Sequence, residues 1–378
     1  PATLSSRRFA HHARRGAPMD ALTADSPAAW LAADMAADNG WRFTISAPAA
    51  KAAAAAVKAA YDPDRPLFDY RRDEFDFGDG LAVLAAARTE ALHGRGLALV
   101  HGLPRADLTE AEFELLNWAI GLHSGVARPQ GKASQYIAAV RNVGTDYRAA
   151  NGRGFSSNFA LDFHVDGGDL TTLGCYNTAK EGGQSMITSS LSAFLQLRAE
   201  RPDLADCLTE TFYFSRQQEE APDEGPFYAQ PLLDAADGRA FAKWNRNRVR
   251  TAQDLDGVPA LSARQNETID LLDEILRRPA LMVSLYLAPG DLQILNNHTM
   301  LHSRTAYVDH DEPADKRLLH RLWLAPPDSV ELPESWGDFY RATAPGTVRG
   351  GIRGHHHDAA CHAFDRRQAA DHGMTMPG

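Results

Sequence analysis

The chain has 378 residues, of which 44% are hydrophobic, and this is enough to bury the core of one large, elaborated domain. Its formal net charge of −10 at pH 7 argues against a nucleic-acid or membrane-surface binder, because phosphate-rich partners reward clustered Lys and Arg. The three cysteines, Cys175, Cys207 and Cys361, lack CxxC spacing and so indicate neither a disulfide framework nor a thiolate zinc site. We expect a cytoplasmic protein that acts on a small molecule and binds neither nucleic acid nor membrane. The sequence leaves the oligomeric state open.

The N-terminal residues do not predict an export signal. Arg7-Arg8 resembles part of a twin-arginine signal, but His11, His12, Arg14 and Arg15 follow where such a signal needs an apolar segment. No apolar run is long enough to span a bilayer. We expect four segments in chain order: a disordered leader at 1–25, a helical appendage at 26–93, a core at 94–330 with a lid or insertion near 201–278, and a C-terminal extension at 331–378.

Helical and strand-like patterns then alternate along the chain. The Ala-rich stretch 26–60 favours helices, the apolar run 97–100 between glycine-containing turns predicts a buried strand, and 110–121 predicts an amphipathic helix. Further strands are predicted at 136–140, 159–164, 170–177, 281–287, 292–295 and 318–324, and further helices at 191–200, 204–211 and 262–278.

The pattern of elements favours an α+β fold. The sequence has no repeat of fixed period and no Gly-rich phosphate loop after a predicted strand, so solenoid and nucleotide-binding folds are disfavoured. Short strands in two separated groups favour a sandwich or jelly roll.

The strongest local motif is His164-Val165-Asp166. Residues i and i+2 of a strand point to the same face, so this imidazole and this carboxylate are able to bind one metal ion. A distant second histidine would complete the facial triad of non-haem Fe(II) oxygenases, and His298 and His302 are the candidates. Downstream, Arg317 and Arg321 flank or lie on a predicted core strand, where an unpaired guanidinium is costly and so implies an anionic partner.

The order of these motifs resembles that of the taurine-dioxygenase-like 2-oxoglutarate oxygenases over residues 94–326. The shared features are the His-x-Asp motif, the turn Pro289-Gly290-Asp291, the Asn-Asn-x-x-x-x-His pattern that ends at His302, and the Arg-x-x-x-Arg pattern of Arg317 and Arg321. The resemblance implies a double-stranded β-helix core, with Fe(II), 2-oxoglutarate and O2 as cofactors and cosubstrates.

The resemblance also implies roles for individual residues. His164, Asp166 and His302 would bind iron and form the catalytic centre, and Arg317 would bind the far carboxylate of 2-oxoglutarate. Ser185, which follows a Gly-Gly pair, would support that carboxylate, with Thr188 as the fallback. Arg321 would contact either the substrate or the cosubstrate.

This chain departs from the family pattern at two positions. His298 follows Asn297 where the family often has arginine, which adds a rival imidazole, and Ser185 stands where threonine is commoner. Because the pattern uses one distal histidine, we expect His302 to be the ligand and His298 to lie behind it or face solvent.

The implied reaction is hydroxylation or desaturation of a small organic metabolite with release of succinate and CO2. Asp166 disfavours halogenation, because related halogenases replace this carboxylate with a small residue. Two alternatives remain open: a jelly-roll metal-binding or regulatory protein without turnover, and a hydrolytic zinc enzyme, which would leave the arginine strand unexplained.

Three further patterns are expected to be structural. The run at 355–357 predicts a solvated loop of histidines, because adjacent side chains cannot all face one ion. Arg246, Arg248 and Arg250 alternate as on a strand and predict a solvated face, with recognition of an acidic substrate as the alternative. The phenylalanines at 155, 159 and 163 predict a loop followed by a strand, packed in the core or against a pocket.

Overall fold

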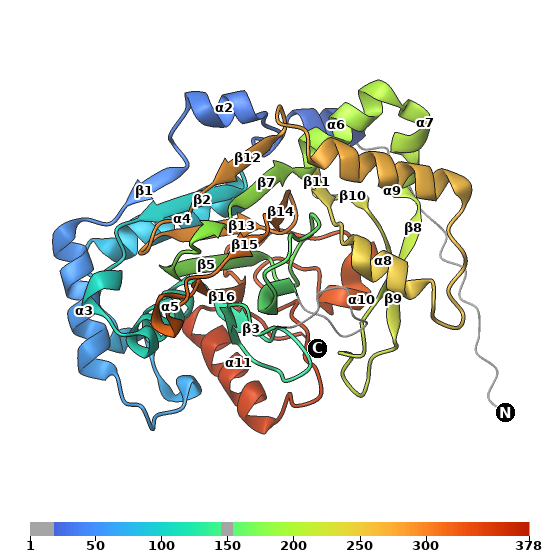
Figure 1. Ribbon diagram of the computed structural model, residues 1–378. Helices are drawn as coiled ribbons and strands as arrows, with labels where there is room; N and C mark the ends of the chain where they lie inside the picture. The colour runs from blue at the N-terminus through green and yellow to red at the C-terminus, as the bar shows by residue number, and fades with distance from the viewer. Residues whose placement is uncertain (1–18, 145–153, 378) are drawn as a thin grey trace.

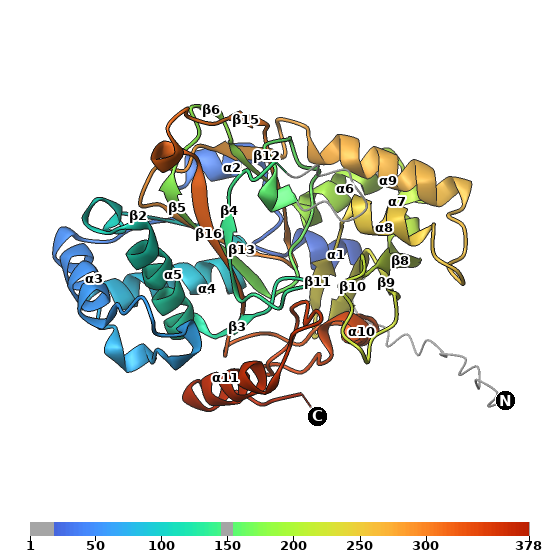
Figure 2. The same cartoon turned by 60° about the horizontal axis from the view of Figure 1, so that its bottom comes forward.

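The computed structural model describes residues 19–144 and 154–377, and these form a mixed helical and β structure (Figure 1). Helices gather at two ends of the molecule, and strands run between them (Figures 1 and 2). Most of the expected leader, residues 1–18, lies outside the described residues. Its last residues do not form a disordered segment, because Met19–Ala24 is helix α1, which packs against helix α6 (Ser190–Glu200).

The larger sheet has the strand order β1-β2-β13-β5-β16-β3, and β4 also pairs with β16. Neighbouring strands are antiparallel, apart from the parallel pair β1 and β2. The strands are β1 (Arg42–Thr44), β2 (Leu97–His101), β3 (Val126–Arg128), β4 (Ile137–Val140), β5 (Leu170–Asn177), β13 (Leu292–Asn296) and β16 (Leu318–Ala325).

The smaller sheet has three antiparallel strands in the order β12-β7-β14. Its strands are β7 (Ser185–Ser189), β12 (Met282–Leu285) and β14 (Met300–Arg304). The remaining strands form two-stranded pairs: β6 (Glu181–Gly182) with β15 (Tyr307–Val308), β8 (Thr211–Ser215) with β9 (Phe227–Pro231), and β10 (Leu233–Ala236) with β11 (Arg239–Ala242).

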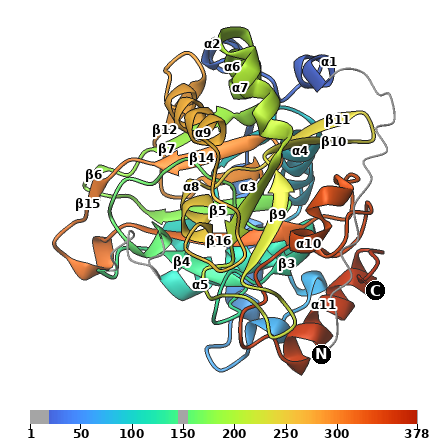
Figure 3. The ribbon, with the colours of Figure 1, turned by 90° about the vertical axis from the view of Figure 1, so that its right-hand side faces the viewer.

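Helices cover the outer sides of both sheets. Helices α4 and α5 contact strands of the larger sheet and α3 packs on α5, whereas α6 contacts the smaller sheet and α9 packs on α6 (Figures 1 and 3). The other α-helices are α2 (Ala32–Ala37), α3 (Ala47–Ala60), α4 (Gly80–His93), α5 (Glu110–Ser124), α7 (Pro202–Ala205), α8 (Arg246–Ala252), α9 (Ala263–Leu276), α10 (Gly337–Tyr340) and α11 (Ala359–Asp371). Short 3-10 turns are η1 (Leu67–Asp69), η2 (Arg72–Glu74), η3 (Arg105–Asp107), η4 (Gly154–Ser156), η5 (Asp206–Thr209), η6 (Pro313–Asp315) and η7 (Glu334–Trp336).

Helix α5 illustrates how the local sequence positions the core. Thr109 caps its first turn by accepting from the backbone N–H of Glu112, and the Glu112 carboxylate accepts from the Thr109 N–H in return. A Cβ atom on Gly121 would lie 2.8 Å from a methyl carbon of Leu322 in β16, so glycine allows α5 to approach the sheet closely. The resulting core fixes β16, which carries Arg321, against a rigid support.

The structure confirms the strands expected at 97–100, 170–177 and 318–324 and the helix at 110–121. It corrects two other expectations. The predicted helix at 204–211 breaks into α7, η5 and the start of β8, and the segment 159–164 makes only isolated pairs with β14 in place of a regular strand. The expected insertion, 201–278, holds two strand pairs and helices α8 and α9. None of the described helices is long and apolar enough to cross a membrane.

Candidate metal centre

His164 and His302 are held side by side by the backbone. His302 lies in β14, and the N–H groups of His164 and His302 each donate to the carbonyl of the other residue at 3.0 Å. Residues that exchange both hydrogen bonds in an antiparallel pair project their side chains from the same face. The two imidazole rings accordingly lie 4.4 Å apart between centroids. A single backbone pairing thus joins the early and late histidines of the predicted triad.

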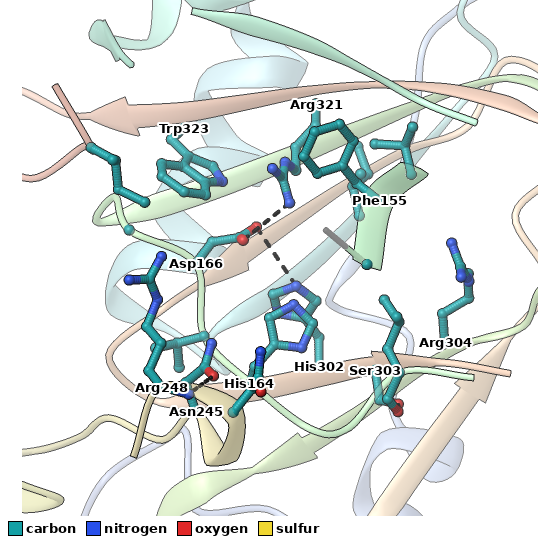
Figure 4. Close-up of a pocket in the computed structure, with 18 of the residues that line it drawn as sticks. Phe155, His164, Asp166, Asn245, Arg248, His302, Ser303, Arg304, Arg321 and Trp323 are labelled. Carbon is teal, nitrogen blue, oxygen red and sulfur yellow. Dashed lines mark hydrogen bonds and ion pairs between the residues drawn. The ribbon is translucent and has the colours of Figure 1, made fainter. Parts of the chain in front are cut away.

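Asp166 completes the cluster two residues after His164. One potential ligand atom from each of His164, Asp166 and His302 lies within 4.8 Å of the others, and Figure 4 shows the three side chains converging on one point. His302 Nε2 lies 3.7 Å from Asp166 Oδ2. Within residues 19–144 and 154–377, this is the one group of three such side chains close enough to share an ion. Two imidazoles and one carboxylate on one side leave positions open for other ligands, as in non-haem Fe(II) sites.

Polar neighbours fix the orientation of the ligand side chains. The Thr171 hydroxyl donates to Asp166 Oδ2 at 3.0 Å, and Asn297 donates to that hydroxyl at 3.0 Å while its side-chain oxygen accepts from the Asp166 N–H at 3.1 Å. His164 Nδ1 lies 2.8 Å from the Asp162 carbonyl, which leaves Nε2 of that ring for a metal ion. Such outer partners set the tautomer and direction of the ligands.

The electrostatics put all three groups in the protonation state that metal binding requires. Burial favours the neutral form of Asp166, but Arg321 and the two imidazoles outweigh this effect and hold the pKa of Asp166 at about 2. Burial lowers the pKa of His302 to about 3, and it also lowers the pKa of His164. At neutral pH the carboxylate is therefore ionised and both imidazoles are neutral, with lone pairs available.

We expect Thr171→Val to weaken Fe(II) affinity by about 10- to 100-fold, the range for removal of an outer-shell hydrogen bond to a ligand. The hydroxyl of Thr171 is buried and donates to Asp166, and valine keeps its shape. Affinity is measured by anaerobic competition with a chelator. The control is Thr172→Val, the same change at the next residue of β5, whose side chain points to the other face of the strand. Equal affinities of the two variants would show that the Thr171 hydrogen bond does not orient the carboxylate.

The triad opens into a cavity of about 130 Å³. Arg248 and Asn245 lie on one side of the triad, Ser303 and Arg304 lie on the other, and the rings of Phe155 and Trp323 lie beside Arg321 (Figure 4). Apolar side chains complete the lining, with Leu173 and Leu319 from the larger sheet and Leu287 and Ile352 from segments outside the named strands.

The burial and the hydrogen bonding of Arg317 indicate whether the cavity suits an anionic cosubstrate. Its side chain lines the cavity and is only 7% exposed, and its Nη1 has no hydrogen-bond partner among the described residues. The guanidinium carbon of Arg317 lies 4.9 Å from the centroid of the Tyr307 ring. Gly183 has φ of +74°, and a Cβ there would lie 3.2 Å from Arg317 Nε. A buried donor in this cradle suits a bound carboxylate.

The other predicted carboxylate-binding residues differ in position. Ser185 lines the cavity, and its hydroxyl donates to Gln293 Oε1 at 2.7 Å. Thr188 donates to the Leu276 carbonyl at 2.8 Å and is not among the lining residues, so it does not replace Ser185. Arg321 lines the cavity and is already engaged, because its Nη1 lies 3.1 Å from Asp166 Oδ1 and its Nε donates to Gln130 at 2.8 Å.

His298 lies outside the triad, as expected from the family pattern. Its Nε2 lies 2.8 Å from Asp169 Oδ1, and Arg349 donates to the same carboxylate oxygen through Nη2 at 2.6 Å. Arg349 and His298 outweigh the effect of burial and hold the pKa of Asp169 at about 2. This buried cluster links the segment after Asp166 to the C-terminal extension. The extension therefore supports the site, a role that the sequence alone did not indicate.

Two of the expectations for basic residues are wrong. The segment containing Arg246, Arg248 and Arg250 is helix α8 and not a strand, because Asn245 caps it by accepting from the Arg248 N–H. Arg248 is buried, not solvated, and donates to Glu219 and to the Ser215 carbonyl. The asparagine cap before the basic run was the local sign of a helix start.

The histidine run is also only partly solvated. His355 and His356 are exposed, but the His357 side chain is buried and its Nε2 lies 3.1 Å from the Tyr136 hydroxyl and 3.6 Å from Asp365 Oδ2. Phe155 lines the cavity, Phe163 is buried in the core and Phe159 is exposed, so the three rings do not form one surface.

Comparisons with known proteins agree with this geometry. The sequence model described as "Taurine catabolism dioxygenase TauD, TfdA family" matches residues 63–323. FR-33289 synthase of Streptomyces rubellomurinus (strain ATCC 31215) is 26% identical over 320 residues, which cover 82% of this chain and 93% of that protein. A uridine-5'-phosphate dioxygenase of Amycolatopsis sp is 28% identical over 182 residues, covering 46% of this chain and 64% of that protein.

Solved structures show the same fold at lower identity. Asparagine oxygenase in complex with Fe(II), 2S,3S-3-hydroxyasparagine and succinate has a TM-score of 0.57 and 18% identity, over 75% of this chain and 93% of that one. The non-haem iron oxygenase OrfP in complex with Fe and alpha-ketoglutaric acid has a TM-score of 0.53 and 17% identity, over 75% of this chain and 94% of that one.

Proposed function

The chain belongs to the TauD, TfdA family of dioxygenases, and from this premise we propose that His164, Asp166 and His302 hold its Fe(II) while Arg317 holds 2-oxoglutarate. The enzyme is a 2-oxoglutarate-dependent dioxygenase that hydroxylates, or desaturates, a small organic metabolite and releases succinate and CO2. One observation carries the assignment of residues: the two imidazoles and one carboxylate share a cavity with a buried guanidinium that has an unsatisfied donor.

We propose that the two sheets form a double-stranded β-helix around this cavity. The backbone pairing of His164 with His302 supports this arrangement, because it extends the smaller sheet by a further segment beside β14. The larger sheet contributes Arg321 from β16 and Leu173 from β5 to the same cavity. The ligands thus belong to the edge of one sheet, and the residues for anion binding are divided between both sheets and the adjoining loops.

We propose that the insertion at 201–278 covers one end of the cavity. Gln217, Tyr228 and Arg248 come from this segment and line the cavity together with the triad. The C-terminal extension contributes Phe339 and Ile352. Both segments would exclude water from a bound substrate, which protects a reactive centre from side reactions.

The chain's own residues have separable roles in this reaction. When bound, iron supplies the activation of O2 that is coupled to decarboxylation of 2-oxoglutarate. Arg317 fixes the far carboxylate of 2-oxoglutarate, and Ser185 supports the same group. Thr171 and Arg321 hold the two Asp166 oxygens in place, at 3.0 and 3.1 Å, so that the carboxylate meets the metal in one orientation.

We also propose a small-molecule substrate and a cytoplasmic location. The small cavity, lined by both polar and apolar side chains, supports the first proposal. The three cysteines are buried free thiols, which supports a reducing compartment for the second.

An anaerobic absorption titration with Fe(II) and then 2-oxoglutarate tests the assignment. We expect a visible charge-transfer band from the chelate and, after oxygen is admitted, succinate release that rises with the correct substrate. Confirmed iron binding without this band would contradict the cosubstrate site and favour a metal-binding protein without turnover.

A further inference from the structure

Lys243 lies in the same wall of the cavity as His164 and Asp166, two of the proposed iron ligands. The Val165 N–H donates to the Trp244 carbonyl at 3.0 Å, and His164 pairs with Asn245 in an antiparallel bridge. If the register of the His164–Asn245 bridge is continued by two residues, Lys243 lies opposite Asp166. Alternation along the segment then places the Lys243 and Asn245 side chains on the face that carries His164 and Asp166, and all four line the cavity.

The ammonium group of Lys243 has no polar partner among the described residues. Lys243 is 4% exposed, and its Nζ makes no hydrogen bond and no ion pair there. Its neighbours are aromatic, with Nζ 3.3 Å from the ring centroid of Phe339, 4.6 Å from that of Tyr340 and 5.3 Å from that of Tyr228. Ring faces attract a cation but do not satisfy three N–H donors.

The nearby carboxylates are already paired with other cations. Arg248 Nη2 lies 3.1 Å from Glu219, and Arg216 Nη2 lies 2.8 Å from Asp338. Burial, together with these two guanidinium groups, lowers the pKa of Lys243 well below its ordinary value. A charged Lys243 is therefore costly in the free protein and needs a negative partner that the described residues do not supply.

We propose that Lys243 binds an acid group of the primary substrate, so that this enzyme selects a small organic anion. This assignment rests on the proposed function, which places 2-oxoglutarate at Arg317 and leaves the wall of Lys243 for the substrate. Arg321 does not meet the same need, because its Nη1 and Nε are bonded to Asp166 and Gln130. Asn247, which also lines the cavity, offers amide donors to the same acid group.

Calorimetric titration of the Fe(II) and 2-oxoglutarate complex under anaerobic conditions tests this inference, with butyrate and propylphosphonate as acid probes and butyramide as the neutral probe. We expect at least one acid to bind the parent protein and the amide to bind more weakly. The preferred acid distinguishes a carboxylate substrate from a phosphonate. In Lys243→Met we expect acid affinity to fall at least about tenfold, because a charge-assisted hydrogen bond in a buried site is lost. Lys243→Arg should keep part of the affinity.

The matched control is Lys51→Met, the same change at an exposed position of α3, which should bind the acid as the parent does. Lys243→Met should not lower the melting temperature, because it removes a buried amine that has no hydrogen-bond partner among the described residues, whereas a lysine with a purely structural role would destabilise the fold when lost. Equal acid affinity in Lys243→Met and the parent, or no binding of either acid to the parent, would overturn the inference.

The outcome is separable from that of the proposed function. The charge-transfer band should form in Lys243→Met as in the parent, because Lys243 is not a ligand of iron or of 2-oxoglutarate. A missing band in the parent would contradict the proposed function, while the difference in acid affinity between the parent and Lys243→Met, measured without cosubstrate, would still report acid binding at Lys243.

Discussion

Replacing Asp166 with asparagine is expected to abolish turnover and to weaken Fe(II) binding by more than about 100-fold, beyond the range for an outer-shell partner. Asp166 is the one carboxylate in the cluster of three ligands, and its pKa of about 2 keeps it charged at neutral pH. An amide has nearly the same shape but no charge, so it is a poor ligand for a divalent cation. Iron affinity, the charge-transfer band and succinate release are the three measurements.

Asparagine is preferable to alanine because of Arg321. The Arg321 guanidinium pairs with Asp166 Oδ1, and removal of the whole carboxylate would leave this buried charge alone, at a cost of about 3–5 kcal/mol of stability. The amide oxygen of asparagine still accepts from Arg321, so the fold should survive. Asp162→Asn is the matched control, because its carboxylate is 45% exposed, pairs with Arg277 and lies two residues before His164. Parent-like iron affinity in Asp166→Asn would exclude this carboxylate as a ligand.

Backbone geometry predicted that His164 and Asp166 can share a metal ion, whereas the choice of His302 and the reaction class came from the resemblance to the oxygenase family. His164 and Asp166 lie two residues apart in an extended segment, so they share a face whatever the rest of the chain does. The family match confirms the expected membership and reaction class. The roles of His164, Asp166 and His302 stay predictions, supported by the cluster that their side chains form.

The sequence could not predict which segment lies beside His164 and Asp166 in the wall of the cavity. Lys243 and Asn245 lie beside His164 and Asp166 because the segment after β11 pairs with residues 164–165, a long-range backbone pairing that no local pattern indicates. The same pairing sets the start of α8 and buries Arg248. Alternating basic residues on a strand and basic residues in the first turns of a helix look alike when the asparagine cap is overlooked.

The role of the C-terminal extension was equally inaccessible from local patterns. Arg349 lies 180 residues from Asp169, yet its guanidinium makes three contacts of 2.6–3.2 Å with that carboxylate. Because Asp169 also contacts His298, this ion pair ties together three distant parts of the chain around the ligand segment. Pairing between distant buried charges depends on the assembled core, which single-sequence reasoning does not supply.

Replacing Arg317 with methionine is expected to weaken 2-oxoglutarate binding by about 2–5 kcal/mol, which corresponds to roughly 30- to 4000-fold in dissociation constant. Arg317 is buried and lines the cavity, and its Nη1 has no hydrogen-bond partner among the described residues, whereas methionine keeps the apolar stem without the donors. Iron affinity should stay at the parent value, because Arg317 does not belong to the cluster of ligands. The titration with Fe(II) and then 2-oxoglutarate separates the two effects.

Two further variants show whether the guanidinium itself binds the cosubstrate. Lys316→Met removes the positive charge of the neighbouring exposed residue, so it should leave 2-oxoglutarate affinity unchanged if long-range attraction contributes little. Arg317→Lys keeps a charge but loses the planar pair of donors, and it should bind 2-oxoglutarate with intermediate affinity. If Arg317→Met bound the cosubstrate as tightly as the parent, the far carboxylate would have to lie elsewhere. Arg321 and Lys243 would then be tested next, because both are buried cations that line the cavity together with the triad.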